Sequence, residues 1–176
     1  MEESKSGELT SISWRMLGTA VVGLSRLAVV STEGLIPLMS TIILETEKGF
    51  VTFSYSQEGF DVRGPERYEE IRWNVEPGLI MGRHGVAEEW LSLTPLEDHV
   101  EVPELPFLVD AVTGWFGIGG FRDTFAIILR SGSQALVAMT TDEFDIYVSN
   151  SQAARARAEL VAKNMGLTFV EEEHRL

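Results

Sequence analysis

Apolar and polar residues alternate with a period of two in the first half of the chain, as in strands that bury one face. The alternation is clean at residues 50–56, and strand-favouring runs at 39–46 and 60–63 flank it, with turns at 47–49 and 57–59. In the middle run, Val51, Phe53 and Tyr55 fall on one face. The pattern predicts a three-strand antiparallel meander.

The second half repeats this pattern about 85 residues later, with runs at 124–131, 135–141 and 144–147. Ile42-Ile43-Leu44 aligns with Ile127-Ile128-Leu129. When one residue is skipped, Phe60-Asp61-Val62 aligns with Phe144-Asp145-Ile146. The matched order predicts an internal duplication, and two similar meanders that arose by convergence are the alternative.

Weaker patterns cover the rest of the first half and the connection between the halves. Residues 1–10 are polar and predict a flexible tail. Ile12, Trp14 and Met16 alternate as in a strand. The valines of residues 18–30 favour strand over a short helix. After Gly64-Pro65, where a short helix is the alternative, the spacing of Ile71, Trp73 and Val75 indicates another strand. The connection at 76–106 includes an expected short helix at 86–93.

The C-terminal region predicts a helix over residues 152–165. Asn150 or Ser151 is its N-cap and Gly166 ends it. Its apolar stripe consists of Ala154, Ala158, Val161 and Met165. A short last strand at 167–170 and an exposed acidic tail at 171–176 complete the expected structure.

The predicted fold class is α+β and β-rich: antiparallel meanders in two related halves, with a C-terminal helix and a short last strand. We expect one globular domain over 11–170, with pseudo-repeats at about 11–75 and 86–149. A chain of 176 residues can bury one such core without disulfides or a structural metal.

The absence of cysteine excludes disulfides, thiolate catalysis and cysteine-ligated metal centres. The N-terminus lacks the charge pattern of a signal peptide, and the most apolar early run, residues 16–30, is interrupted by Arg26. That run is also shorter than the roughly 20 residues needed to span a bilayer. A cytoplasmic location without membrane contact is the expectation.

Charge narrows the classes of partner. The chain carries 27 acidic against 14 basic residues, a formal net charge of −13. Nucleic acid is disfavoured as a partner, because its phosphates are bound by clusters of Lys and Arg. A basic protein partner, or self-association, fits better. The alternative is that the acidic surface serves solubility alone.

Few residues suggest catalysis. His84, His99 and Asp98 are candidates for a pocket in a small-molecule-binding protein or a hydrolase, with the site between the two repeats. Neither histidine has the fixed spacing of a metal motif, and no G-x-S-x-G nucleophile elbow is present. We therefore assign no catalytic residue and expect no metal and no cofactor.

Residues 114–122 combine four glycines with Trp115, Phe116, Phe121 and Arg122. The spacing is not that of a phosphate-binding loop. If these side chains are exposed, they form a partner-binding cluster of the kind that dominates interfaces. If they are buried, the segment is a bulge or wide turn whose aromatic rings cap the core.

The favoured functional hypothesis is a non-catalytic protein-interaction module that binds a basic partner. An inhibitor or a toxin-neutralising, immunity-like protein is one such module. The alternative is the small-molecule-binding protein or hydrolase with a site between the repeats.

Overall fold

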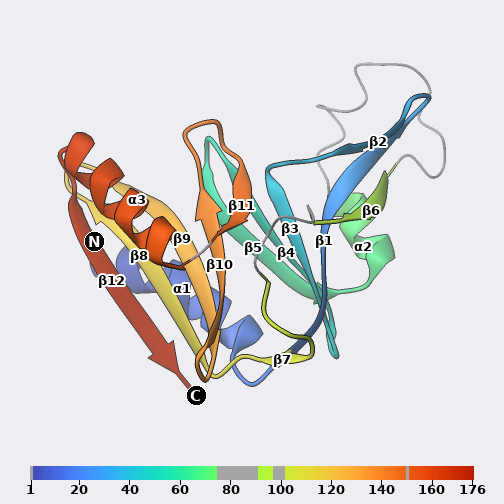
Figure 1. Cartoon of the computed structure of the whole chain (residues 1–176), viewed down its shortest axis with the longest axis horizontal. Coiled ribbons are helices and arrows are strands. Elements are labelled where there is room, and N and C mark those ends of the chain that lie inside the picture. The colour runs from blue at the N-terminus through green and yellow to red at the C-terminus, as the bar shows by residue number, and fades with distance from the viewer. Residues whose placement is uncertain (1, 75–90, 97–101, 150) are drawn as a thin grey trace.

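Two antiparallel sheets, and a helix that packs against both, make up the structure (Figure 1). The computed structural model describes residues 2–74, 91–96, 102–149 and 151–176. Within these ranges antiparallel strands dominate and three helices accompany them. The predicted β-rich α+β class is therefore confirmed.

Sheet A follows helix α1 (Glu2–Met16) and has the spatial order β2-β1-β3-β4-β5, with β6 and β7 also paired to β1. Its strands are β1 (Ala20–Ser31), β2 (Gly34–Pro37), β3 (Thr41–Thr46), β4 (Gly49–Ser56), β5 (Gly59–Glu66), β6 (Leu91–Pro95) and β7 (Phe107–Leu108). Helix α2 (Tyr68–Asn74) follows β5.

Sheet B has the order β11-β10-β9-β8-β12. Its strands are β8 (Ala111–Ile118), β9 (Arg122–Ser131), β10 (Gln134–Thr140), β11 (Ile146–Ser149) and β12 (Thr168–Arg175). Helix α3 (Ser151–Asn164) covers the face of sheet B that points away from sheet A (Figure 1). The prediction of this helix is confirmed to within one residue at each end.

Both predicted meanders are present, and their first hairpins have the same register. Thr46 pairs with Gly49 across the β3–β4 turn, and Ser131 pairs with Gln134 across the β9–β10 turn. Deeper in the two hairpins, Leu44 pairs with Val51 as Leu129 pairs with Leu136. The sequence alignment of the first hairpins is thus also their structural alignment. A common origin of the halves stays a prediction.

The alignment of the third strands is wrong. Phe60 and Asp61 lie inside β5, opposite Tyr55 and Ser54. By contrast, residues 141–145 form a longer turn, so Phe144 and Asp145 precede β11. In sheet A, Val62 stands opposite Phe53. At the equivalent place in sheet B, the residue opposite Ala138 is Val148 and not Ile146. The repeated letters Phe-Asp concealed the difference in turn length.

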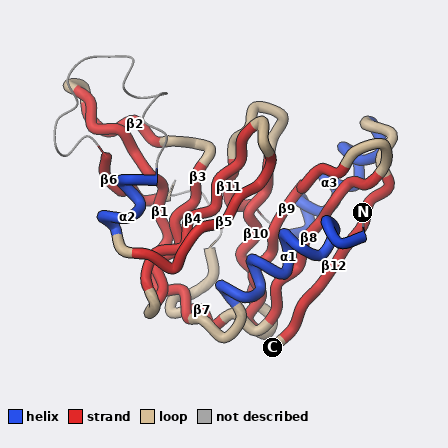
Figure 2. The backbone as a smooth tube through the Cα atoms, turned by 180° about the vertical axis from the view of Figure 1, so that it is seen from behind, coloured by secondary structure: helices blue, strands red, loops and turns tan. Residues whose placement is uncertain are grey.

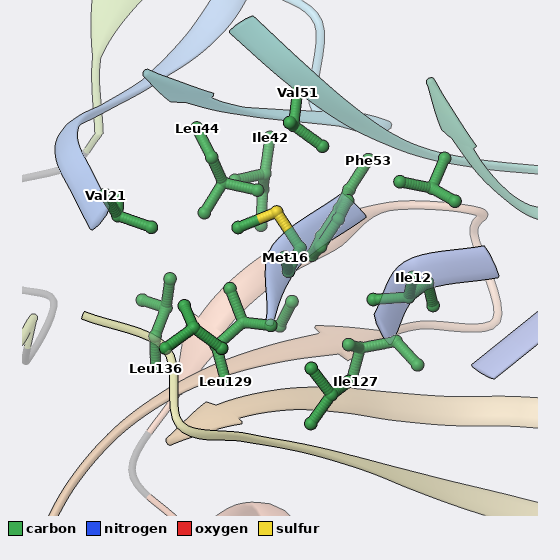
Figure 3. Close-up of a cluster of buried hydrophobic side chains, with 14 of the residues drawn as sticks. Ile12, Met16, Val21, Ile42, Leu44, Val51, Phe53, Ile127, Leu129 and Leu136 are labelled. Atoms are coloured by element: carbon green, nitrogen blue, oxygen red, sulfur yellow. The ribbon is translucent and has the colours of Figure 1, made fainter. Parts of the chain in front are cut away.

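One hydrophobic core lies between the sheets and includes α1 (Figure 3). Leu9, Ile12 and Met16 are fully buried there, at the spacings of three and four that place residues on one helix face. Ile42 and Leu44 of β3, and Ile127 and Leu129 of β9, belong to the same cluster. The matched isoleucine–leucine positions of the two meanders thus serve a shared core.

The residues between these pairs point to the opposite faces of their sheets. Ile43 belongs to a small cluster with Leu27, Ile71 and Leu91 on sheet A. Ile128 belongs to a larger cluster beneath α3 on sheet B. Each sheet is therefore buried on both faces near its centre, which explains continuous apolar runs such as residues 126–129.

The predicted N-terminal tail and the strand at 12–16 are wrong, because residues 2–16 form α1. Ile12 and Met16 are buried while Trp14 is 76% exposed, so the three residues do not share a strand face. The buried residues Leu9, Ile12 and Met16 have helical spacing, whereas the alternation of Ile12, Trp14 and Met16 had predicted a strand.

The predicted acidic tail at 171–176 is also wrong, because β12 continues to Arg175 and pairs with β8 over its whole length. Two of its glutamates, Glu171 and Glu173, have partners. Glu171 accepts hydrogen bonds from the Trp115 indole and the Arg155 guanidinium, at 2.7 and 2.8 Å. Glu173 pairs with Arg130 and Arg175. These pairs neutralise the glutamates on that face of the strand.

Two smaller expectations change. The residues around Ile71 form the short helix α2 rather than the expected strand, and the Ile71 side chain of this helix is buried. Of the short helix expected at 86–93, residues 86–90 lie outside the described residues, and residues 91–93 belong to β6 instead, which pairs with β1. Among the described residues, no helix has both the length and the apolar character needed to cross a membrane.

Candidate functional site

A pocket lies where the ends of the two meanders meet. The β4–β5 turn at 57–58 and the β10–β11 turn at 141–145 lie side by side (Figures 1 and 2). The ring of Phe144 stands 5.7 Å from the ring of Tyr55, measured between centroids. The pocket beside them has a volume of about 210 Å³ and is lined by residues of both sheets and of α3.

The floor of the pocket is apolar. Its lining includes Phe125, Met139, Ala158, Val161 and Met165. The first three are buried, whereas Val161 is half-buried and Met165 is 39% exposed. The alanine face of α3 lets the helix lie close to sheet B, and its longer side chains one turn away line the pocket. This surface suits an apolar group.

A hydrogen bond between the sheets forms one polar side of the pocket. The Tyr55 hydroxyl of β4 donates to Oδ1 of Asp123 on β9 at 2.9 Å. Burial raises the pKa of Tyr55 well above its usual range, and the negative Asp123 beside it raises it further. The hydroxyl therefore stays protonated at physiological pH and acts as a donor to Asp123.

The β10–β11 turn holds Phe144 in an unusual conformation. Its φ of 62° lies in the left-handed region, which bulky residues rarely adopt. The Thr141 hydroxyl accepts hydrogen bonds from the backbone N–H groups of Glu143 and Asp145, each at 3.2 Å. Such a backbone costs on the order of 1–3 kcal/mol and clusters at functional sites. Here it brings the Phe144 ring to the pocket.

Carboxylates predominate around the opening. The pocket lining and the two turns contain Glu58, Asp123, Asp142, Glu143 and Asp145, against one guanidinium, that of Arg157 on α3. Glu58, Asp142 and Glu143 are exposed. The negative potential of such a cluster attracts cationic groups.

A second polar contact lies next to Asp123 in the sequence of β9 and connects this strand to α1. The Thr124 hydroxyl donates to both carboxylate oxygens of Glu8, at 2.9 and 3.1 Å. Burial raises the pKa of Glu8, the Thr124 hydrogen bond and the Arg122 charge lower it, and nearby Asp123 and Glu172 raise it. The group joins α1 to the strand that carries Asp123.

The described residues offer little for catalysis. No group of three or more His, Cys, Asp or Glu side chains converges among them as a metal site would require. Ser13 Oγ and His174 Nδ1 lie 3.0 Å apart, but Ser13 is only 6% exposed. This pair connects α1 to β12, so His174 is part of the folded structure and not of an exposed tail at 171–176.

Trp115 and Phe116 do not form an exposed cluster, since they are only 2% and 0% exposed. The β8–β9 pairing shifts register between them, and the two rings pack on opposite faces of sheet B. The expectation of an exposed cluster is thus wrong for these two residues, and the alternative of a bulge with core aromatics fits them. A Cβ on Gly114 would lie 2.4 Å from the Phe116 ring, so this glycine makes room for an aromatic side chain.

Phe121 and Arg122 lie at the β8–β9 turn. Phe121 is 55% exposed, and the Arg122 guanidinium stacks over the Phe116 ring at 4.1 Å. Their role in partner binding stays a prediction. His84, Asp98 and His99, the candidates for the alternative pocket, lie outside the described residues.

Sequence reasoning missed this pocket, which lies between the ends of the two meanders and which we call the junction pocket. Tyr55 and Asp123 are 68 residues apart, and Arg157 comes from a third element. Only residues 142–144 carried a local signal, an apolar ring beside carboxylates, and we expected no more there than a turn into the strand at 144–147. Proximity in the fold, not a motif, creates the site.

No family model, curated protein or solved structure matches this chain.

Proposed function

We propose that the protein is a non-catalytic interaction module that binds a basic segment of another protein at the junction pocket. The observation that carries the proposal is the combination of an apolar floor with exposed carboxylates in one place. Interfaces use buried apolar anchors within a polar rim, and charge complementarity directs the encounter. An inhibitor or toxin-neutralising protein that blocks a basic enzyme would be such a module.

The net charge supports the same proposal. A formal charge of −13 accelerates association with a cationic partner and repels an acidic one. The carboxylates of Glu171 and Glu173 on β12 are engaged by arginines of the chain itself. The exposed turn carboxylates at the junction are therefore the better acidic contact.

Small-molecule binding is the second candidate, favoured by the position of the pocket between the two meanders. Its volume of about 210 Å³ is smaller than the roughly 300–1,000 Å³ of small-molecule sites. That size suits one side chain of a protein partner better than a whole ligand.

The test selects short random peptides, displayed on phage, against the wild-type protein at low and high salt. We expect the selected peptides to be rich in Lys and Arg and to bind more weakly as salt rises. The double variant D142N/E143Q should weaken their binding by up to about 30-fold, since each of the two exposed charges contributes up to about 1 kcal/mol.

The matched control is E33Q/E104Q, which changes the net charge equally at exposed positions of the β1–β2 turn and the segment before β7. It should leave binding close to wild type. Selection of neutral or acidic peptides would overturn the proposal. An equal loss in both double variants would also overturn it, because binding would then depend on total charge and not on this site.

A further inference from the structure

The junction pocket limits what kind of basic segment fits. We infer that the pocket takes one apolar side chain of the partner, aromatic or branched aliphatic, and that a Lys or Arg adjacent to it in the partner's sequence contacts the carboxylates of the β10–β11 turn. The inference rests on the proposed function and specifies the partner for the same site.

The apolar part of the inference comes from the floor. Phe125 and Met139 present buried ring and thioether surfaces from sheet B, and Val161 of α3 and Met165, directly after the helix, add to the apolar lining. A methionine side chain adapts to differently shaped occupants, because it is unbranched and polarizable. Charged groups would lose their hydration against such a surface, so the inserted group is an apolar one.

The cationic part of the inference comes from the adjacency of Phe144 and the carboxylates. Phe144 lines the pocket, and Asp142 and Glu143 directly precede it in the turn. An apolar side chain beside Phe144 therefore places the next residues of the partner close to carboxylates. The left-handed backbone at Phe144, with φ of 62°, fixes this adjacency in the free protein.

Arg157 gives the site a direction. This exposed guanidinium lines the pocket from α3, whereas Asp123 and Asp142 line it from β9 and the β10–β11 turn. A cation of the partner is attracted to the β9 and turn side and repelled from the α3 side. The partner's Lys or Arg should therefore lie on one side of its apolar anchor, which a selected sequence motif would reveal.

The test uses the peptides selected against the wild-type protein. Val161→Phe narrows the pocket, and Leu160→Phe makes a similar change one residue earlier, at a position that is 57% exposed and outside the lining. We expect V161F to bind the peptides about 10- to 100-fold more weakly, the loss that corresponds to one buried apolar side chain. The L160F variant should bind as wild type, and thermal melts of both variants check their folding.

A second measurement does not depend on the folding of any variant. Each selected peptide is resynthesised with Ala in place of its apolar residue or in place of the adjacent Lys or Arg. Loss of binding with both replacements supports the inference. If only the cation matters and V161F binds normally, the inference is overturned and the proposed function stands.

Other occupants give distinct results. Selection of apolar peptides without a cation would overturn both the inference and the proposed function. Size-exclusion chromatography of the wild type and V161F tests a second copy of the chain. A wild-type dimer that becomes monomeric in V161F would assign the pocket to self-association and overturn the inference.

Discussion

The two meanders begin alike and end differently. Their first hairpins share one register, and matched isoleucine–leucine pairs from both enter the same core. Their third strands then separate: β5 follows a turn at 57–58, whereas β11 follows a turn at 141–145. The shared part builds the core, and the longer turn of the second meander brings Phe144 and its carboxylates to the pocket.

The same contrast appears at matched positions next to the turns. Tyr55 and Thr140 occupy equivalent places in β4 and β10, and both line the pocket. Tyr55 donates across the junction to Asp123 of the other sheet. The Thr140 hydroxyl lies 2.7 and 3.1 Å from the backbone oxygens of Thr124 and Phe125, to which it donates within its own sheet. The site thus depends on differences between the halves.

The largest expected effect tests whether the two meanders share one core. Ile42→Ala in β3 and Ile127→Ala in β9 each remove a buried side chain, and each should lower the free energy of unfolding by about 2–5 kcal/mol. Because both residues belong to one cluster, each variant should unfold in a single transition. Urea unfolding followed by circular dichroism and tryptophan fluorescence measures this.

Non-coincident transitions in those two signals would contradict the shared core. In that case I42A would shift one transition and I127A the other. Ser133→Ala, at an exposed position of the β9–β10 turn, is the control for substitution in a meander away from the core, and it should leave the transition unchanged.

The prediction of intermediate size concerns a turn residue of the first hairpin, Gly49, whose counterpart in the second hairpin is less constrained. Gly49 has a φ of 128°, and a Cβ there would lie 2.8 Å from the backbone oxygen of Glu66. The β4–β5 pairing shifts register here and brings Glu66 opposite Phe50. We expect Gly49→Ala to lower the free energy of unfolding by about 1–3 kcal/mol, because the backbone is strained and the neighbour is main chain.

Gln134 is the matched control, because it holds the equivalent place in the second hairpin and its side chain is exposed. Gln134→Ala should change the free energy of unfolding by less than about 0.5 kcal/mol. Equal losses in G49A and Q134A, measured by urea unfolding, would show that the register shift in β4–β5 imposes no constraint of its own.

The first hairpins could be predicted from the sequence because alternation and tight turns are local signals. The two-residue turns at 47–48 and 132–133 and the flanking strands follow from them. The register of the third strands could not be predicted, because the alignment matched the Phe-Asp residues whereas the register depends on the length of the turn. At α1, Ile12 and Met16 fit both periods, and only Leu9, buried in the core, favours the helix.

The site was less predictable than the fold. Of the proposed partner-binding residues, Trp115 and Phe116 are in the core because β8 is buried on both faces. Its edges are also covered, since it pairs with β12 on one side and with β9 on the other. A glycine-rich aromatic segment has the same composition whether glycine exposes the backbone or makes room for rings. Sequence therefore could not distinguish the interface from the bulge at this segment.

The smallest expected effect concerns how α1 is attached to the two sheets. Arg15 donates to the backbone oxygen of Gly64 in sheet A, whereas Glu8 accepts from Thr124 in sheet B. Burial raises the pKa of Glu8, so the folded protein holds that proton more tightly than the unfolded chain. Stability from this group is therefore full below pH 4.5, the ordinary pKa of a glutamate, and is lost as pH rises through the folded pKa.

Glu8→Gln should remove this slope while its amide oxygen still accepts from Thr124. As the pH rises from about 4.5 to 7, the free energy of unfolding should fall more for the wild type than for E8Q. The stability of E8Q relative to the wild type should therefore increase toward neutral pH. Urea midpoints across this range measure it, with Glu33→Gln on the exposed β1–β2 turn as control. If the stability difference between the wild type and E8Q stays constant with pH, Glu8 has the same pKa in the folded and the unfolded protein. The contact of Glu8 with Thr124 would then make no pH-dependent contribution to stability.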